Sequence, residues 1–331
     1  MVAQIAKTER KHAMVPGPAA QEKRLRVLIP YDGSETAEAT LNELSKAALP
    51  PELDALITVT QVCLPSSPYE ITSAVSARRL KLLTSGLSSH VPAFQEHEEQ
   101  RVLSLEAERR LRSMFPKGRV KTEAIEDTAA VVQAILRKAE HWGAELIILG
   151  SKTSPSALIS DYAGPALRVA QDAHCSVRIV RPSDRKPEAA IQIVICVDES
   201  SSSHEVVNAV GERMWPTGTI ANIVMTRKPV PRSVTRDAGA AQVLDTWADT
   251  LRAKGLEVSV EIVDSQPGEV LLQKSRESSV GCIFVDRHHG GGDVEASGLS
   301  ASAKALILGA QCSVEVVRAN SSNDRYLKPA A

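Results

Sequence analysis

The chain of 331 residues is long enough for two domains of ordinary size, and 43% apolar with 24% charged residues is a globular composition. A net charge of −1 and 3% aromatic residues give no reason to expect nucleic acid or an anionic membrane as a partner. No apolar run approaches the roughly 20 residues that a membrane helix needs. Residues 1–24 lack the apolar core of a secretory signal and are expected to be a disordered tail.

The cysteines indicate neither a zinc site nor a disulfide framework. No two of them have the spacing of a metal-binding pair, and most lie in or beside apolar runs, where a thiol behaves as a small hydrophobic group. This usage suits a reducing compartment, so we expect a cytoplasmic protein without a bound metal. The cysteines are Cys63, Cys175, Cys196, Cys282 and Cys312.

Residues 25–181 predict a first α/β domain. A buried strand at 26–30 leads through the turn of Asp32, Gly33 and Ser34 into a helix, and Ser34 can cap that helix. Such a turn presents backbone N–H groups at the carboxyl edge of a sheet, where open α/β folds bind ligands. Further strands are expected at 56–63, 120–125, 146–149 and 176–180, with helices at 93–115, 128–143 and 165–172.

The segment near 64–92 has no counterpart of equal length in the second half and is therefore an insertion. It is either a lid or docking segment, or a surface segment packed on its own domain without chemistry. Both interpretations stay open.

The second half repeats the pattern of the first. A polar linker at 182–190 precedes a second domain at 191–318, and a tail follows at 319–331. The two domains end alike, in Ala173–Arg181 and Ala310–Arg318, so the chain is an internal repeat. We expect strands at 191–197, 220–225, 256–263, 282–285 and 313–317, and helices from Val206, at 238–254 and at 267–275.

The strands that end the two domains are expected to pair with each other. Val177–Val180 and Val314–Val317 would each leave an exposed sheet edge in a separate domain. An antiparallel pairing covers both edges. The chain would then form an intramolecular pseudo-dimer, and a further homodimer of chains stays open.

Three motifs, Val27–Glu35, Ala144–Ser151 and Ala173–Arg181, together resemble the universal stress protein (UspA) family. The resemblance covers nearly all of the first domain and, more weakly, the second. It implies an α/β fold: two tandem, open, parallel five-stranded sheets flanked by helices, which is Rossmann-like and similar to adenine-nucleotide α-hydrolases. One branch of the family binds ATP and another does not, so the resemblance implies either no cofactor or ATP.

The resemblance also implies where a nucleotide would bind in the first domain. The ATP-binding branch has an Asp after its first strand and a glycine-rich pattern after its fourth. The corresponding residues here are Tyr31, Asp32, Val62, Gly150, Ser151, Lys152 and Gly164.

The glycine pattern is broken in this chain. Thr153 replaces the second glycine, Ala163 and Gly164 replace the final Gly-Ser pair, and Pro165 supplies no N–H. Phosphates are bound by bare backbone N–H groups and hydroxyls, so these changes weaken the expected phosphate site. Lys152 would compensate in part with its charge.

The second domain departs further from the pattern and is expected not to bind nucleotide. Asp198 keeps the acidic position, but Asp286 replaces the first glycine, where a carboxylate repels a triphosphate. The run Gly290–Gly292 is expected to be a flexible loop without a matching helix start. His288 and His289 could bind a metal together with Asp286, but two adjacent histidines on a loop are usually just exposed.

The sequence supports three functional hypotheses. The first is a non-enzymatic regulatory protein of the stress response that acts through an unidentified protein partner. The second is an ATP-binding switch or weak ATPase that uses the first domain. The third is a pure interaction module that docks through the insertion. A catalytic role for Asp32 is disfavoured, because no positioned acid or base accompanies it in the sequence.

Overall fold

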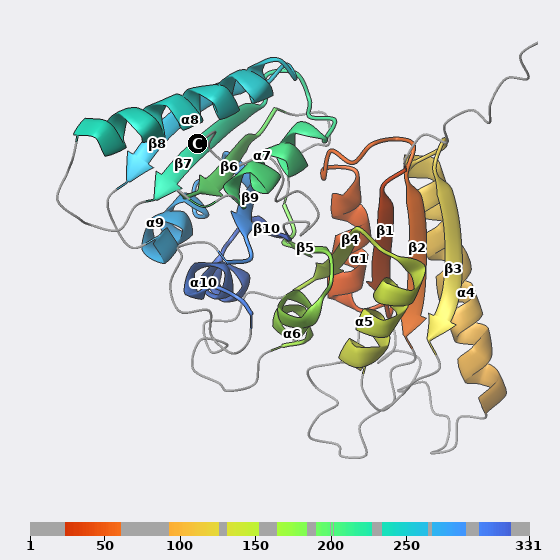
Figure 1. Ribbon diagram of the computed structural model, residues 1–331. Helices are drawn as coiled ribbons and strands as arrows, with labels where there is room; N and C mark the ends of the chain where they lie inside the picture. Colours follow the sequence, from red (N-terminus) through yellow and green to blue (C-terminus); the bar gives the residue numbers. More distant parts are fainter. Residues whose placement is uncertain are drawn as a thin grey trace, which may run out of the picture.

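Figure 1 shows the computed structural model of the chain. It describes residues 24–60, 93–125, 131–151, 164–183, 190–198, 200, 202–226, 234–263, 267–288 and 298–318. Of these, residue 60 and residues 93–100 and 234–238 are described by their backbone only. The insertion, the linker residues 184–189 and the Gly290–Gly292 run lie outside the described residues.

The two halves share one ten-stranded sheet with the order β3-β2-β1-β4-β5-β10-β9-β6-β7-β8. Each half contributes five neighbouring strands that are parallel to one another. The expected α/β fold of tandem parallel sheets is therefore confirmed. The strands are β1 (Arg26–Tyr31), β2 (Asp54–Thr60), β3 (Arg119–Ile125), β4 (Leu146–Gly150), β5 (Ser176–Val180), β6 (Gln192–Val197), β7 (Ile220–Thr226), β8 (Glu257–Val263), β9 (Val280–Asp286) and β10 (Ser313–Val317).

Helices cover both faces of the sheet (Figure 1). On one face, helices of both halves share a single apolar core, whereas on the other each half has a core of its own. No described helix is long and apolar enough to span a membrane. The first face carries α5 (Val131–Trp142), α6 (Pro165–Asp172), α9 (Pro267–Lys274) and α10 (Ala301–Gly309); the second carries α1 (Glu35–Leu44), α4 (Ala93–Met114), α7 (Ser203–Gly211) and α8 (Val234–Arg252).

The junction between the halves is the one antiparallel pairing in the sheet. Strand β5 pairs with β10, with Arg178 directly opposite Glu315. This confirms the expected contact of the two terminal strands and the intramolecular pseudo-dimer. The pairing removes both strand edges from solvent, which protects each half against pairing with another chain.

The structure contains one helix that the sequence did not predict. Ser300 caps this helix, α10, by accepting a hydrogen bond from the backbone N–H of Ala303. The first helix, α1, ends at Leu44, and Ala48 beyond it has a positive φ of 54°.

Candidate functional site

The strand order of the first half reverses between β1 and β4, where β2 lies to one side and β5 to the other. In open parallel sheets this reversal leaves a crevice at the carboxyl ends of the strands. Asp32 follows β1, Gly150 ends β4 and Ser151 follows it, and Gly164 precedes α6. Val62 and Lys152 lie outside the described residues. The topology thus places these four predicted residues at the same edge of the sheet.

Asp32 and Ser34 form the turn that starts α1. One carboxylate oxygen of Asp32 accepts a hydrogen bond from the backbone N–H of Ser34 at 3.0 Å. The Ser34 hydroxyl accepts one from the N–H of Ala37 at 3.2 Å, which caps the helix. Gly33 between them has a φ of 71°, which favours glycine. Among the described residues, no hydrogen bond to the second oxygen of the half-buried Asp32 is found, so this oxygen is a candidate contact for a ligand.

Gly150 is required by helix packing. A Cβ atom built on Gly150 would lie 2.6 Å from the hydroxyl oxygen of Thr40 and closer still to the carbonyl oxygen of Thr36. Helix α1 therefore packs its backbone directly onto the end of β4. The Thr40 hydroxyl is held there because it donates to the Thr36 carbonyl at 2.8 Å. Helix packing alone therefore explains the glycine at this position, which the sequence analysis had assigned to a phosphate site.

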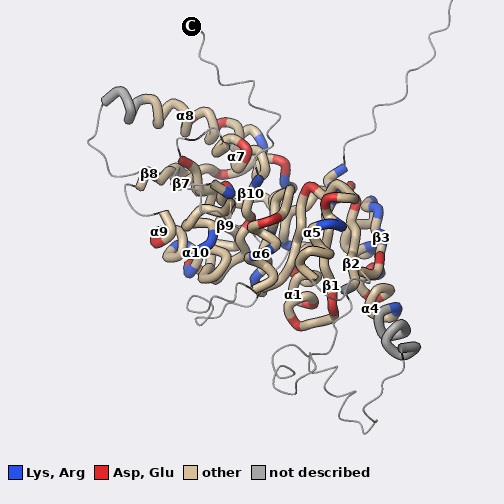
Figure 2. Tube along the Cα trace, turned by 60° about the horizontal axis from the view of Figure 1, so that its bottom comes forward, with Lys and Arg blue, Asp and Glu red and all other residues tan. Residues whose placement is uncertain are grey.

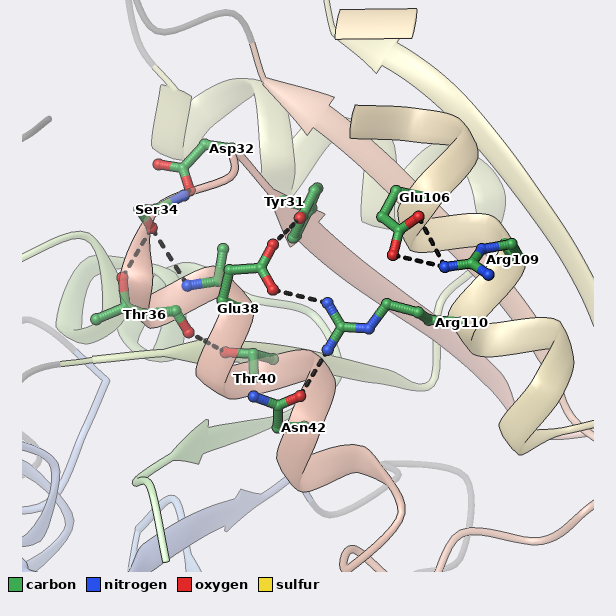
Figure 3. A network of polar contacts seen from close by, with 11 residues as sticks. Tyr31, Asp32, Ser34, Thr36, Glu38, Thr40, Asn42, Glu106, Arg109 and Arg110 are labelled. Carbon is green, nitrogen blue, oxygen red and sulfur yellow. Dashed lines mark hydrogen bonds and ion pairs between the residues drawn. The ribbon is translucent and has the colours of Figure 1, made fainter. Parts of the chain in front are cut away.

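Tyr31 lies in a polar network that joins β1, α1 and α4 (Figure 3). Its side chain is 1% exposed, and its hydroxyl donates a short hydrogen bond to Glu38. Arg110 donates to Glu38 at 2.7 Å and to Asn42 at 2.6 Å. Burial, and then the Glu38 carboxylate, raise the pKa of Tyr31, so the phenol stays protonated. The sequence did not reveal this network, because Arg110 lies 72 residues from Glu38.

Ser151 connects this edge to the second half of the chain. Its carbonyl oxygen accepts a hydrogen bond from the guanidinium of Arg181 at 2.8 Å. The same guanidinium donates to the carbonyl oxygens of Ile307, at 2.6 Å, and Ala310, at 3.3 Å, at the end of α10. A cation is favoured at that end of a helix. Burial lowers the pKa of Arg181 to about 10. The sequence signal for this residue was its place at the end of the repeated motif.

Gly164 leaves the start of α6 without a side-chain cap. It occupies the N-cap position without a side-chain hydrogen bond, and Pro165 follows it in the first turn. A Cβ atom on Gly164 would meet no described residue within 4 Å. The start of α6 offers a ligand neither a hydroxyl nor the first N–H of the helix.

The equivalent edge of the second half is occupied by two buried carboxylates. Asp198 is 8% exposed and accepts hydrogen bonds from Ser200 and Ser203. Asp286 is 1% exposed, and one of its oxygens accepts from the Ser202 hydroxyl at 2.8 Å and from the N–H of His288 at 3.1 Å. Its other oxygen is buried and has no hydrogen-bond partner among the described residues.

One sequence expectation for this edge is wrong. Its helix start exists, because α10 begins after Ser300, but the Ser300 hydroxyl already caps the helix. The expectation that the second half has no matching helix start is therefore wrong. Within the part of the chain that the structure describes, no group of three metal-ligating side chains occurs; His289 falls outside it.

Comparisons with known proteins find a family match for the first half and a fold match for both halves. Residues 23–181 match the model of the universal stress protein family. A universal stress protein from Archaeoglobus fulgidus superposes with a TM-score of 0.60 at 17% identity, covering 90% of this chain and 97% of that one. A putative universal stress protein from Pseudomonas aeruginosa superposes with a TM-score of 0.50 at 13% identity, covering 88% and 92%. No curated protein matches the sequence significantly. Residues 23–181 are thus similar to the universal stress protein family, and both halves together have the fold of the Archaeoglobus protein.

Proposed function

We propose that this protein is a non-enzymatic regulator of the universal stress protein type that acts through a protein partner. The observation that supports the proposal is that predicted site residues of the first half, at the carboxyl ends of its strands, make structural contacts. Ser34 caps α1, Gly150 makes room for α1, and Tyr31 is buried against Glu38. Residues that already hold the fold together are not free to drive a reaction.

The second half supports the same proposal. A triphosphate that entered its edge would approach the carboxylates of Asp198 and Asp286, and like charges at short range repel strongly where water is excluded. The described Lys and Arg residues are interspersed with Asp and Glu in Figure 2. Such a mixed surface suits a protein partner better than nucleic acid, which favours a continuous basic face.

A nucleotide switch in the first half is the second candidate. It is favoured by the carboxylate oxygen of Asp32 that has no partner among the described residues, and by the uncapped start of α6 at Gly164. An Asp at this position would accept hydrogen bonds from an adenine or a ribose. Ser151 and Lys152 would bind the phosphates, and Val62 would line the base. Weak ATP hydrolysis is part of this candidate only.

Calorimetry with ATP and ADP on the full chain separates the two candidates. The test variant is Asp32→Ala, and the matched control is Asp198→Ala, which removes the carboxylate from the same position of the second half. The regulator proposal expects no heat of binding at millimolar nucleotide and no phosphate release from ATP. Micromolar binding that is lost in Asp32→Ala and kept in Asp198→Ala would instead establish the nucleotide switch.

The insertion is the proposed partner surface, although residues 64–92 lie outside the described residues. Deleting them from the full chain is the test, and the urea midpoint of the deletion variant checks that the two cores of the first half remain folded. Once a partner is in hand, the deletion should abolish its binding. Unchanged binding would remove the insertion from the proposal.

A further inference from the structure

The junction between the halves has an approximate two-fold symmetry. The backbone N–H of Arg181 donates to the Ser313 hydroxyl at 3.1 Å, and that of Arg318 donates to the Ser176 hydroxyl at 3.1 Å. Both pairs join corresponding positions of the two repeated motifs. These contacts would form equally well between two like halves, so they hold the junction together without selecting the partner.

The pair on the symmetry axis breaks this equivalence. Arg178 and Glu315 occupy the same position of the repeated motif, and the strand register sets them directly opposite each other. The guanidinium of Arg178 lies 3.1 Å from the Glu315 carboxylate. In a pairing of two like halves the same register would set Arg against Arg, or Glu against Glu, and like charges directly opposite are destabilising.

Burial strengthens the electrostatic interaction between Arg178 and Glu315. The side chains of Arg178 and Glu315 are 5% and 0% exposed, so water screens them poorly. Arg213 of the second half donates to the other oxygen of Glu315 at 2.5 Å and is itself 6% exposed. Glu315 thus balances two buried guanidinium groups, one from each half. Removing one partner of such a group leaves a buried charge without compensation.

We infer that the strand edge at the junction is specific for the unlike half: β5 of a first half accepts β10 of a second half and rejects a second β5, and β10 likewise rejects a second β10. The partner that fits each edge is therefore the other half, in the same chain or in another copy. We expect unlike pairing to be favoured at least about tenfold, because pairing of like halves replaces a buried ion pair by a buried like-charge pair.

The test is a protease site placed within linker residues 184–189 of the full chain. The folded protein is cut, unfolded in urea and refolded, and the complexes are counted by native mass spectrometry. Unlike pairs should exceed like pairs at least about tenfold. The variant Arg178→Met with Arg213→Met and Glu315→Met removes all three charges; it should still pair but should lose the preference. Random pairing of the wild-type halves, or an unchanged preference in the triple variant, would overturn the inference.

A second measurement in the uncut chain does not require the halves to refold separately. Arg178→Glu sets two carboxylates opposite each other, whereas Arg178→Met only removes a charge. The urea midpoint should therefore fall further for Arg178→Glu than for Arg178→Met. Equal midpoints would show that charge at this position does not select the partner strand.

Discussion

Replacing Gly150 by Ala tests whether this residue serves the fold or a phosphate. The added Cβ would lie 2.6 Å from the Thr40 hydroxyl oxygen and nearer to the Thr36 carbonyl oxygen, and both distances are shorter than real Cβ contacts. The Thr36 carbonyl belongs to the backbone of α1, so no rotamer change relieves the clash. Overpacking of this kind costs about 1–3 kcal/mol, and we expect a loss of that size in the free energy of unfolding.

The assay is urea unfolding of the full chain followed by circular dichroism. Gly164→Ala is the matched control, because it adds the same methyl group at the same sheet edge with nothing within 4 Å. The loss of glycine flexibility offsets the weaker N-cap there, so its stability should stay within about 0.5 kcal/mol of wild type.

The two readings of Gly150 give opposite results. If the glycine is required by α1, Gly150→Ala loses stability equally with and without ATP. A Gly150→Ala protein with wild-type stability would refute the packing argument. Loss of ATP binding at unchanged stability would show that the glycine serves a phosphate instead.

Three further predictions follow from single contacts. Burial raises the pKa of Cys175 and of Cys312 from 9.0 to about 12. Because both thiols stay protonated in the folded protein, their contribution to stability is complete below pH 9 and is lost as the pH rises above it. The unfolding free energy should then fall by up to about 1.4 kcal/mol per pH unit for each thiol, and Cys175→Ala should remove the part of this fall that is due to Cys175. Asp286→Asn should raise the urea midpoint, because it neutralises a buried carboxylate with an unpartnered oxygen; a lower midpoint would contradict this. Ser300→Ala should cost about 0.5–2 kcal/mol in the same assay, and no change would show that the cap of α10 is dispensable.

The strands could be predicted because their apolar runs are continuous. A strand of a parallel sheet is buried on both faces, so runs such as Leu146–Leu149 stand out without any other signal. The pairing of the two terminal strands followed from the repeated motif. Helix α10 was missed because it is apolar over most of its surface, so its sequence shows no clear helical periodicity. Ser300, followed by an apolar run, was the signal that could have indicated its start.

The candidate site was less predictable than the fold, because its residues hold contacts between segments distant in sequence. Asp32 and Ser34 were predictable as a turn and cap, since those bonds span two or three residues. The packing role of Gly150 was not, because the clash that it avoids is with α1, more than a hundred residues earlier. The same holds for Arg181, whose carbonyl partners Ile307 and Ala310 lie in the other half.

The repeat offers a comparison within one molecule. Positions that are alike in both halves build the shared sheet: Ser176 and Ser313 accept equivalent hydrogen bonds across the junction. Positions that differ between the halves give the two sheet edges different side chains. Gly150 lets a helix approach closely where Asp286 brings a buried carboxylate, and we expect that carboxylate to repel an anion.

The difference between the halves at the symmetry axis, Arg178 against Glu315, creates a contact between them. Arg178 and Glu315 would each oppose its own charge in a like pair, yet they attract each other in this chain. One duplicated position is therefore sufficient to convert a surface that could bind its own copy into one that requires the other half. Arg181 joins the same two unlike halves, because its guanidinium contacts Ser151 in one half and α10 in the other.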